Sequence, residues 1–327
     1  MTVAIGIDVS KQKLDVAWLR DPEAGKVKTR VFPNTPEGFT ALTEWLVKTT
    51  GAQPTEIGVM MEATGVYHDA LAYALYEAGM TVFVANPQHV HSFRDSFGKR
   101  SKTDKKDSVA LARFLHGRSH KPWQPEPAEV RALKALLGRL HALETDLQRE
   151  QNRLEKASIQ RAAEVEESIR KMLDALEAER KRLCQQIDDH FDNHPGLKSD
   201  KQLLESIPGI GTVLARELTV MLRSRPFQSA NQAAAYLGLV PLADESGLSV
   251  KRPPRLSKVG PARLRAKLYM GAVVATRYNP LIQHLYERLL ARGKAKMSAL
   301  GAAMKKLVQI AYGVLKHQRK YDPQWTS

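Results

Sequence analysis

The stretch of this sequence most able to do chemistry is a basic segment that contains aspartates. Residues 94–107 read R-D-S-F-G-K-R-S-K-T-D-K-K-D, and Asp104 and Asp107 end this run among six lysines and arginines. A metal ion bound to a phosphate would account for the mixture, because carboxylates bind the cation and basic side chains bind the polyanion. We therefore expect a metal site that processes phosphates, with further carboxylates supplied from elsewhere in the chain.

Two further acids occur where such a site needs them. Asp8 is near the end of the first apolar run, and Glu62 follows directly on a short, continuous apolar run. Active sites of open α/β sheets lie beyond the carboxyl ends of strands. Asp104 and Asp107, three residues apart at the start of a predicted helix, share one face of it. Four carboxylates that meet there could hold two Mg²⁺ ions at a phosphodiester.

Each acid also has a purely structural interpretation. Asp104 could cap its helix, and Asp107 could interact favourably with the helix dipole. Asp8 could cap a hairpin turn, Glu62 could be an ordinary strand-end charge, and Asp15 is a competing acid in the next strand. The metal interpretation is favoured because four acids occupy the four positions that one site would need.

The elements that position these acids are predicted to be three strands in hairpin order, followed by alternating helices and strands. The expected strands are 3–9, 14–19, 27–32, 57–61 and 81–85, and the expected helices are about 37–48, 67–78 and 105–117. This is the element order of the ribonuclease-H-like fold, an α/β architecture. Three prolines within residues 118–127 end this domain, which we place at residues 1–125.

Residues 126–195 are predicted to form a helical arm. The stretch 129–194 has no proline, and its leucines recur at spacings of three and four. This pattern is typical of two long helices that pair antiparallel or form a coiled coil. An arm that dimerises and an intramolecular helical hairpin both fit it.

The remaining segment, residues 196–327, is strongly basic and is predicted to be mainly helical. It carries 22 Lys+Arg against 7 Asp+Glu, which accounts for the whole net charge of +15. This asymmetry indicates a nucleic-acid-binding domain. The single cysteine, Cys184, excludes an intramolecular disulfide and a cysteine-based zinc site. No apolar run approaches the length of a membrane span, so we expect a cytoplasmic protein.

Two motifs of this basic segment could bind the phosphates of a DNA backbone. The first is I-P-G-I-G between two helical patterns, the form of a helix-hairpin-helix, in which Gly209 and Gly211 let backbone N–H groups approach a phosphate. The second is a basic loop or hairpin at 239–260. With the first basic segment, the candidate nucleic-acid contacts are Lys99, Arg100, Lys102, Lys105, Lys106, Gly209, Gly211, Lys251, Arg252, Arg255 and Lys258.

The basic loop also contains a candidate nucleophile, Ser246. A serine among arginines and lysines could accept a phosphoryl group, because the cations neutralise the phosphate and a Mg²⁺ ion can assist. Ser249 and Ser257 compete for this role. Many exposed loop serines have no chemical role, so the local sequence alone leaves the choice open.

An ordered set of motifs places the chain beside a known family. G-I-D-V-S-K-Q-K-L-D-V, E-A-T-G, K-T-D-K-K-D, the helical arm, S-I-P-G-I-G and E-S-G-L-S-V-K-R follow one another along the whole chain. Together they resemble the DEDD transposases of the insertion-sequence 110 family, which are relatives of the pilin-gene invertase and are also called bridge-RNA-guided recombinases. The resemblance implies a RuvC-like N-terminal domain with Asp8, Glu62, Asp104 and Asp107 as its catalytic acids.

The resemblance also implies a mechanism and partners. Ser246, with Ser249 as the fallback, would attack the DNA backbone and form a phosphoserine link. The acids of one subunit would act with the serine of another, so homodimers would assemble into a synaptic tetramer. Donor and target DNA would be chosen by a noncoding guide RNA. The protein would be cytoplasmic and associated with the nucleoid when bound to DNA.

Three other functions remain open at this point. A junction resolvase or structure-specific nuclease would hydrolyse DNA with the four carboxylates alone and leave no covalent adduct. A site-specific invertase would use the same chemistry as the transposase but yield a different product. A non-catalytic scaffold would bind nucleic acid without changing it.

Overall fold

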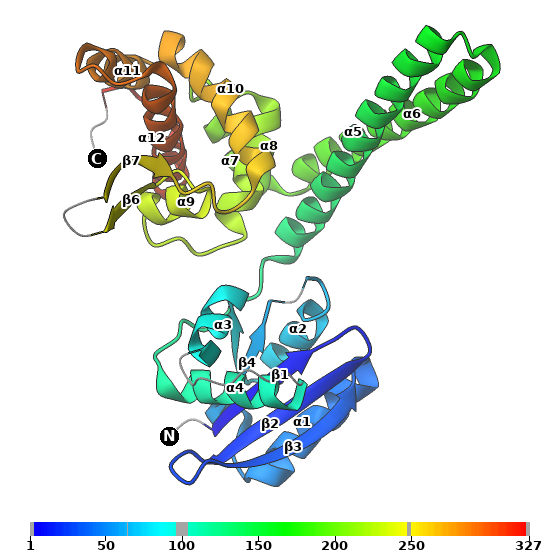
Figure 1. Cartoon of the computed structure of the whole chain (residues 1–327), viewed down its shortest axis with the longest axis vertical. Helices are drawn as coiled ribbons and strands as arrows, with labels where there is room; N and C mark the ends of the chain where they lie inside the picture. Colours follow the sequence, from blue (N-terminus) through cyan, green and yellow to red (C-terminus); the bar gives the residue numbers. More distant parts are fainter. Residues whose placement is uncertain (1–2, 64, 96–103, 247–249, 325–327) are drawn as a thin grey trace. The chain divides into compact units, whose positions relative to one another are not determined.

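The computed structural model describes residues 3–63, 65–95, 104–246 and 250–324, and for residues 104–106, 242–246 and 250–254 it describes the backbone only. The chain divides into two compact units, Met1–Pro125 and Glu126–Ser327, each with its own hydrophobic core (Figure 1). Within the described ranges, no helix is both long and apolar enough to cross a membrane.

A five-stranded sheet forms the centre of the first unit, in the order β3-β2-β1-β4-β5. β1 (Val3–Val9), β2 (Lys13–Asp21) and β3 (Lys26–Pro33) pair antiparallel as consecutive hairpins. β4 (Ile57–Glu62) runs parallel to β1, and β5 (Thr81–Ala85) runs parallel to β4. The sheet therefore contains the five strands that the sequence predicts.

Helices cover both faces of this sheet. α1 (Pro36–Thr50) and α2 (Asp69–Glu77) pack on one face, and a short 3-10 helix, η1 (Pro54–Glu56), precedes β4. α3 (Pro87–Asp95) and α4 (Asp104–Gly117) pack on the other face. Because both faces are covered, the central strand β4 is apolar until its last residue.

Helix α3 was not predicted: the sequence gives a strand at 81–85 and a helix at about 105–117, and the residues between them, which include the basic segment, were read as a loop. The Asn86 side chain accepts a hydrogen bond from the Gln88 backbone N–H at 2.9 Å, and Pro87 occupies the first helical position. Both features favour a helix start. Arg94, the first residue of the basic segment 94–107, therefore lies near the end of a helix rather than in a loop.

The second unit begins with two long helices that pack side by side as a hairpin, α5 (Ala128–Gln160) and α6 (Ala163–Asn193) (Figure 1). Their paired ends bury a core that includes Leu133, Leu137, Ile187 and Phe191. Near the turn that joins them, Ile159, Val165 and Met172 are 76%, 51% and 52% exposed. The apolar residues of the two helices are therefore buried at the end of the hairpin away from the turn and exposed near the turn, which we call the apolar tip.

The rest of this unit is a helical bundle with one β-hairpin. Its elements are α7 (Pro195–Glu205), α8 (Thr212–Arg223), α9 (Ala230–Tyr236), β6 (Pro241–Ser246), β7 (Val250–Leu256), α10 (Ala262–Tyr278), α11 (Pro280–Ala291) and α12 (Lys296–His317). α12 packs against α7, α9, α10 and α11 and supplies much of the core. Helix α11 was not expected from the sequence, although Asn279 caps it and Pro280 is its first residue.

Candidate functional site

Asp8 points to the sheet face that α4 covers. Successive side chains of a strand alternate between the two faces, and Ile5 and Ile7 belong to the core beneath α1 and α2. Ala4 packs instead with Ala112 of α4. Asp8, four residues after Ala4, therefore shares the α4 face, where it is partly buried.

Glu62 lies on the same face and at the same edge of the sheet. Met60 packs with residues of α4, so Glu62, two residues further along β4, has the same orientation. The parallel register pairs Ile7 with Met61, and one more step along both strands brings Glu62 beside Asp8. Paired strands are about 4.8 Å apart. The two carboxylates therefore come from adjacent positions.

The backbone of α4 rests directly on β1 at Gly6. A Cβ atom on Gly6 would lie 2.0 Å from the Ser108 carbonyl oxygen and 2.4 Å from the Ala112 nitrogen. Ala4, earlier in the strand, also contacts Ala112, so α4 runs opposite to β1. The next position on this face, Asp8, then lies level with the first turn of α4, where the other two candidate aspartates occur.

That first turn contributes one carboxylate with a described partner. Asp107, whose side chain is 14% exposed, accepts a hydrogen bond from Nη1 of Arg94 in α3 and forms an ion pair with it. Asp104 is the first residue of α4, and its side chain lies outside the described atoms. The structure thus places the backbone of all four predicted acids along one face and one end of the sheet.

The competing acid, Asp15, also lies there. The antiparallel register of β1 and β2 sets Asp15 opposite Asp8, and such pairs share one face with Cβ atoms about 5 Å apart. The Asp15 side chain is 13% exposed and forms a 3.0 Å ion pair with Lys13. The sequence treats Asp15 as an alternative to Asp8, whereas the register makes the two residues neighbours.

These residues suit a divalent metal in donor type and placement. Carboxylate oxygens are the ligands that Mg²⁺ prefers, and Asp8, Glu62 and Asp107 lie around one edge of the sheet. Among the described side chains, no three His, Cys, Asp or Glu residues form a group that could hold a metal ion. A metal ion bound by Asp107 would have to share that carboxylate with Arg94 or displace Arg94 from it.

The candidate nucleophile lies in the second unit. Ser246 is the last residue of β6, where it pairs with Val250 of β7, so the stretch predicted as a loop or hairpin is a hairpin. The Ser246 side chain and the whole of Ser249 lie outside the described atoms. Ser257 is partly buried, just beyond the end of β7. Ser246 is thus the last residue of β6 that the structure describes, and residues 247–249 lie outside the described chain.

The glycines of the I-P-G-I-G motif have different roles. Gly209 has a φ of +101°, and a Cβ atom there would lie 2.6 Å from the Gly271 carbonyl oxygen in α10. It therefore serves conformation and close packing. Gly211 precedes α8, and a Cβ atom there would meet nothing within 4 Å. Of the two, Gly211 leaves the backbone open to a phosphate.

The predicted basic contacts are only partly described. Lys99, Arg100 and Lys102 lie outside the described residues, and only the backbone of Lys105 and Lys106 in α4 and of Lys251 and Arg252 in β7 is described. Arg255 at the end of β7 is exposed, as is Lys258, which has a positive φ of 55°. Lys258 and Arg255 can therefore contact a polyanion from the surface of the second unit.

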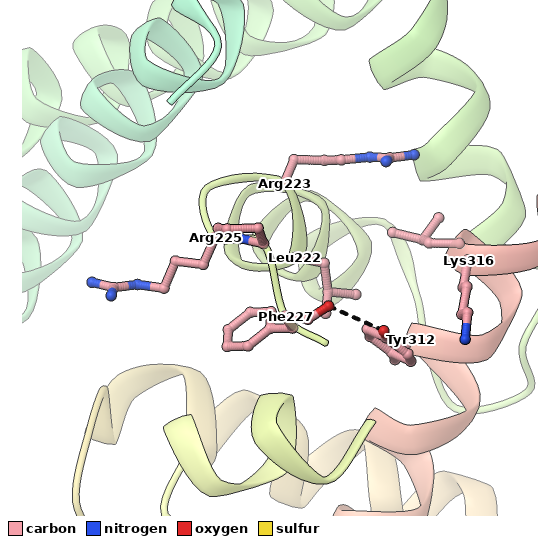
Figure 2. A pocket seen from close by; sticks show the side chains of 8 residues that line it. Leu222, Arg223, Arg225, Phe227, Tyr312 and Lys316 are labelled. Atoms are coloured by element: carbon pink, nitrogen blue, oxygen red, sulfur yellow. Dashed lines mark hydrogen bonds between the residues drawn. The ribbon is translucent and has the colours of Figure 1, made fainter. Parts of the chain in front are cut away.

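A basic cavity in the second unit was missed by the sequence reasoning (Figure 2). It measures about 230 Å³ and lies between the end of α8, the connector that follows it and the last turns of α12. The Tyr312 hydroxyl donates a hydrogen bond to the Phe227 carbonyl at 3.1 Å, which fixes the connector to α12. Its lining residues are Leu222, Arg223, Arg225, Pro226, Phe227, Tyr312, Leu315 and Lys316.

The cations of this cavity differ in their partners. Arg223 donates two hydrogen bonds to Asp200, at 2.5 and 2.6 Å. Arg225 lies over the Tyr236 ring, 4.7 Å from its centroid. No carboxylate among the described residues is within ion-pair distance of Arg225 or Lys316. Because these two come from segments about 90 residues apart in sequence, only the folded structure places both of them at the lining of one cavity.

A partly buried polar cluster joins the helical arm to this bundle. Glu217 of α8 accepts a 2.6 Å hydrogen bond from Lys267 of α10 and also contacts His141 of α5. Burial raises the pKa of Glu217, but the hydrogen bonds from His141 and Lys267 outweigh it, so the pKa is below its usual value. Arg263 of α10 donates to the His141 carbonyl at 2.9 Å. The ionised carboxylate therefore stabilises the junction of three helices.

Comparison with known proteins decides the family. Residues 5–158 match a DEDD family described as transposase, and residues 201–287 match the transposase IS116/IS110/IS902 family. The pilin gene-inverting proteins of Moraxella lacunata and Moraxella bovis are each 32% identical over 321 residues, 97% of both chains. The chain belongs to the IS110 family of transposases.

A more distant relative agrees with this assignment. The insertion element IS900 uncharacterized 42 kDa protein of Mycobacterium paratuberculosis is 27% identical over 173 residues, 51% of this chain and 41% of that protein. The IS110-family chain is therefore a DNA transposase or recombinase. Its DEDD membership suggests use of a divalent metal. The first matched segment contains all four predicted acids, and the second contains Gly211 and Ser246.

Proposed function

We propose that this transposase cuts and rejoins DNA with a Mg²⁺ site in its first unit and a serine nucleophile in its second. The observation that carries the proposal is the convergence of three elements on one face, with Asp8 of β1, Glu62 of β4 and the start of α4 at the same edge. The strand order β3-β2-β1-β4-β5 supports the RuvC-like, ribonuclease-H-like assignment of this unit.

The chemistry follows from these residues. Asp8, Glu62, Asp104 and Asp107 would hold Mg²⁺, which when bound supplies charge that activates an attacking oxygen and stabilises a leaving one. The Ser246 hydroxyl oxygen would bond to phosphorus as the bond from phosphorus to a deoxyribose oxygen breaks. The proton of the hydroxyl would pass through solvent, so that the leaving deoxyribose oxygen ends as a hydroxyl. The phosphoserine link conserves the energy of the phosphodiester, so the reverse step can rejoin a different DNA end.

The two halves of this site lie in different units of the chain, and the family resemblance implies that they meet between subunits. The acids are in Met1–Pro125, and Ser246 is in Glu126–Ser327. We propose that the acids of one subunit act with the serine of another, within a tetramer built from homodimers. The helical arm, with its exposed apolar tip at Ile159, Val165 and Met172, is a candidate element for that assembly.

Nucleic acid would contact the basic surface of the second unit. Gly211, Arg255 and Lys258 offer backbone or side-chain donors there, and Arg225 and Lys316 add cations beside the cavity. The noncoding guide RNA that would supply sequence choice is proposed from the family resemblance. Phosphate contacts position DNA and carry no sequence information.

The experiment is a recombination assay with donor DNA, target DNA and an RNA transcribed from the noncoding DNA that flanks the gene. Ser246→Ala should abolish strand exchange, whereas Ser249→Ala should retain it. Glu62→Gln and Asp104→Asn should abolish exchange without unfolding the protein, as judged by circular dichroism. Normal exchange by Ser246→Ala would refute the serine assignment, and unchanged activity without RNA would refute the guide.

Site-specific inversion is the second candidate outcome of the same chemistry. It is favoured by the two Moraxella relatives, which are pilin gene-inverting proteins. A substrate plasmid that carries the recombination sites in inverted orientation separates the two. Reversal of the intervening DNA indicates an invertase, and excision or insertion of an element indicates a transposase.

A further inference from the structure

The Arg94–Asp107 ion pair lies where a carboxylate of the proposed metal site would be needed. Arg94 projects from the last turn of α3, and Asp107 belongs to the first turn of α4. Their side chains are only 24% and 14% exposed, and Nη1 of Arg94 donates to Oδ1 of Asp107. An ion pair shielded to this degree is screened less by solvent and salt than one on the open surface.

This pair opposes metal binding on two grounds. A divalent ion that coordinates Asp107 must share or displace the arginine that already satisfies it. A positive charge fixed beside the carboxylates also repels a second cation, and in a partly buried site that repulsion is stronger than in water. A guanidinium is, however, well suited to a phosphate, whose geometry matches its forked donors.

We propose that Arg94 competes with the divalent ion for Asp107 and transfers to a DNA phosphate when nucleic acid binds. Arg94 is then a positioning residue that couples metal binding to DNA binding. The inference rests on the proposed metal site and adds its regulation. Such coupling is reciprocal: DNA that removes Arg94 from Asp107 strengthens metal binding, and metal strengthens DNA binding by the same factor.

Calorimetric titration of the full chain with Mn²⁺, without DNA, tests the first half. Arg94→Gln should bind Mn²⁺ about tenfold more tightly than the wild type, a factor that corresponds to about 1.4 kcal/mol. Arg94→Lys keeps the positive charge and should raise the Mn²⁺ affinity less than Arg94→Gln does. Arg20→Gln removes an exposed arginine from β2 of the same unit and should leave the affinity unchanged. In an Asp107→Asn background, Arg94→Gln should raise the Mn²⁺ affinity less than it does in the wild type, because only the charge repulsion by Arg94 remains to be removed.

A second titration, in the presence of a short DNA duplex from the element end, tests the transfer. DNA should raise the Mn²⁺ affinity of the wild type towards that of Arg94→Gln. It should raise the Mn²⁺ affinity of the Arg94→Gln variant much less. An equal rise in the Mn²⁺ affinity of both proteins would overturn the proposal that Arg94 moves from Asp107 to a DNA phosphate.

A merely structural role for the pair makes a different prediction. Arg94→Gln would then lower the melting temperature, because α3 and α4 lose a contact, but would leave the Mn²⁺ affinity at the wild-type value. That result would overturn the inference while the metal site stands. If neither the wild type nor any variant binds Mn²⁺, with or without DNA, the proposed metal site itself fails, and the inference fails with it.

Discussion

Replacement of Gly6 by alanine should disable the enzyme by shifting α4 rather than by touching a catalytic group. The added Cβ atom would lie 2.0 Å from the Ser108 carbonyl oxygen, 2.4 Å from the Ala112 nitrogen and 2.9 Å from the Leu111 Cβ atom. Two of these neighbours are backbone atoms, so a rotamer change cannot relieve the contact. Because real contacts of a Cβ atom are essentially never under 3.0 Å, α4 must recede by about 1 Å.

Two quantities follow from that displacement. Overpacking of this kind costs about 1–3 kcal/mol of the free energy of unfolding. A shift of about 1 Å at groups that position a reaction can lower its rate by roughly a hundredfold, and α4 carries Asp104 and Asp107. Recombination should therefore fall far more than the folded fraction at the assay temperature.

Gly138→Ala provides the control. Gly138 lies inside α5, and a Cβ atom there would meet nothing within 4 Å, so alanine should stabilise the helix by up to about 1 kcal/mol. Chemical denaturation gives the stability of each variant, and the recombination assay gives its activity. Wild-type stability and wild-type activity in Gly6→Ala would refute the claim that α4 rests on β1 and sets the position of the acids.

Three further predictions concern the second unit. Glu217→Gln should lower the free energy of unfolding by about 1–3 kcal/mol at pH 7. Because the pKa of Glu217 is lowered in the folded state, the stabilisation is complete above the ordinary pKa of 4.5 and is lost as the pH falls through the folded-state pKa. The denaturation curves of the wild type and the variant should therefore converge in acid. Gly209→Ala should destabilise the fold through its contact with α10, whereas Gly211→Ala should fold normally and bind DNA less tightly, as measured by thermal melting and fluorescence anisotropy. Arg225→Gln and Lys316→Gln should each weaken binding of DNA regardless of its sequence and reduce the salt dependence of log K by about one unit or less; an unchanged salt dependence would exclude phosphate contacts by these two residues.

The sheet of the first unit could be predicted because its strands carry strong local signals. β4 is a continuous apolar run that ends at Glu62, and the first three strands are separated by short turns. Helix α3 has little apolar periodicity and buries only Val90, so its pattern gives no helix signal. Helix α11 does have helical apolar spacing, with Leu281, Leu285 and Leu289 four residues apart, and was missed although this signal is in the sequence. Both begin with Asn-Pro, at Asn86 and Asn279, and that pair combines a capping side chain with a proline at the first helical position.

The sequence predicts which residue types form the candidate site, and this prediction remains untested, whereas their relative positions could not be predicted. The sequence alone could not show that Asp15 faces the same side of the sheet as Asp8, because that depends on the register of two strands. It also could not show that Asp107 is paired with Arg94, because α3 was read as a loop. Glycine at position 209 was read as a phosphate contact, although close packing on α10 already requires it.

The central claim is that the serine of the β6–β7 hairpin attacks DNA under the control of the acids in the first unit. The direct measurement is mass spectrometry of the protein–DNA adduct formed with guide RNA, both DNA partners and Mg²⁺, followed by digestion of the DNA and mapping of the modified peptide. The account predicts a phosphodeoxyribose remnant on Ser246, absent without metal and absent in Glu62→Gln. Cleaved DNA with free ends and no adduct, or an adduct on Ser249 or Ser257, would contradict it.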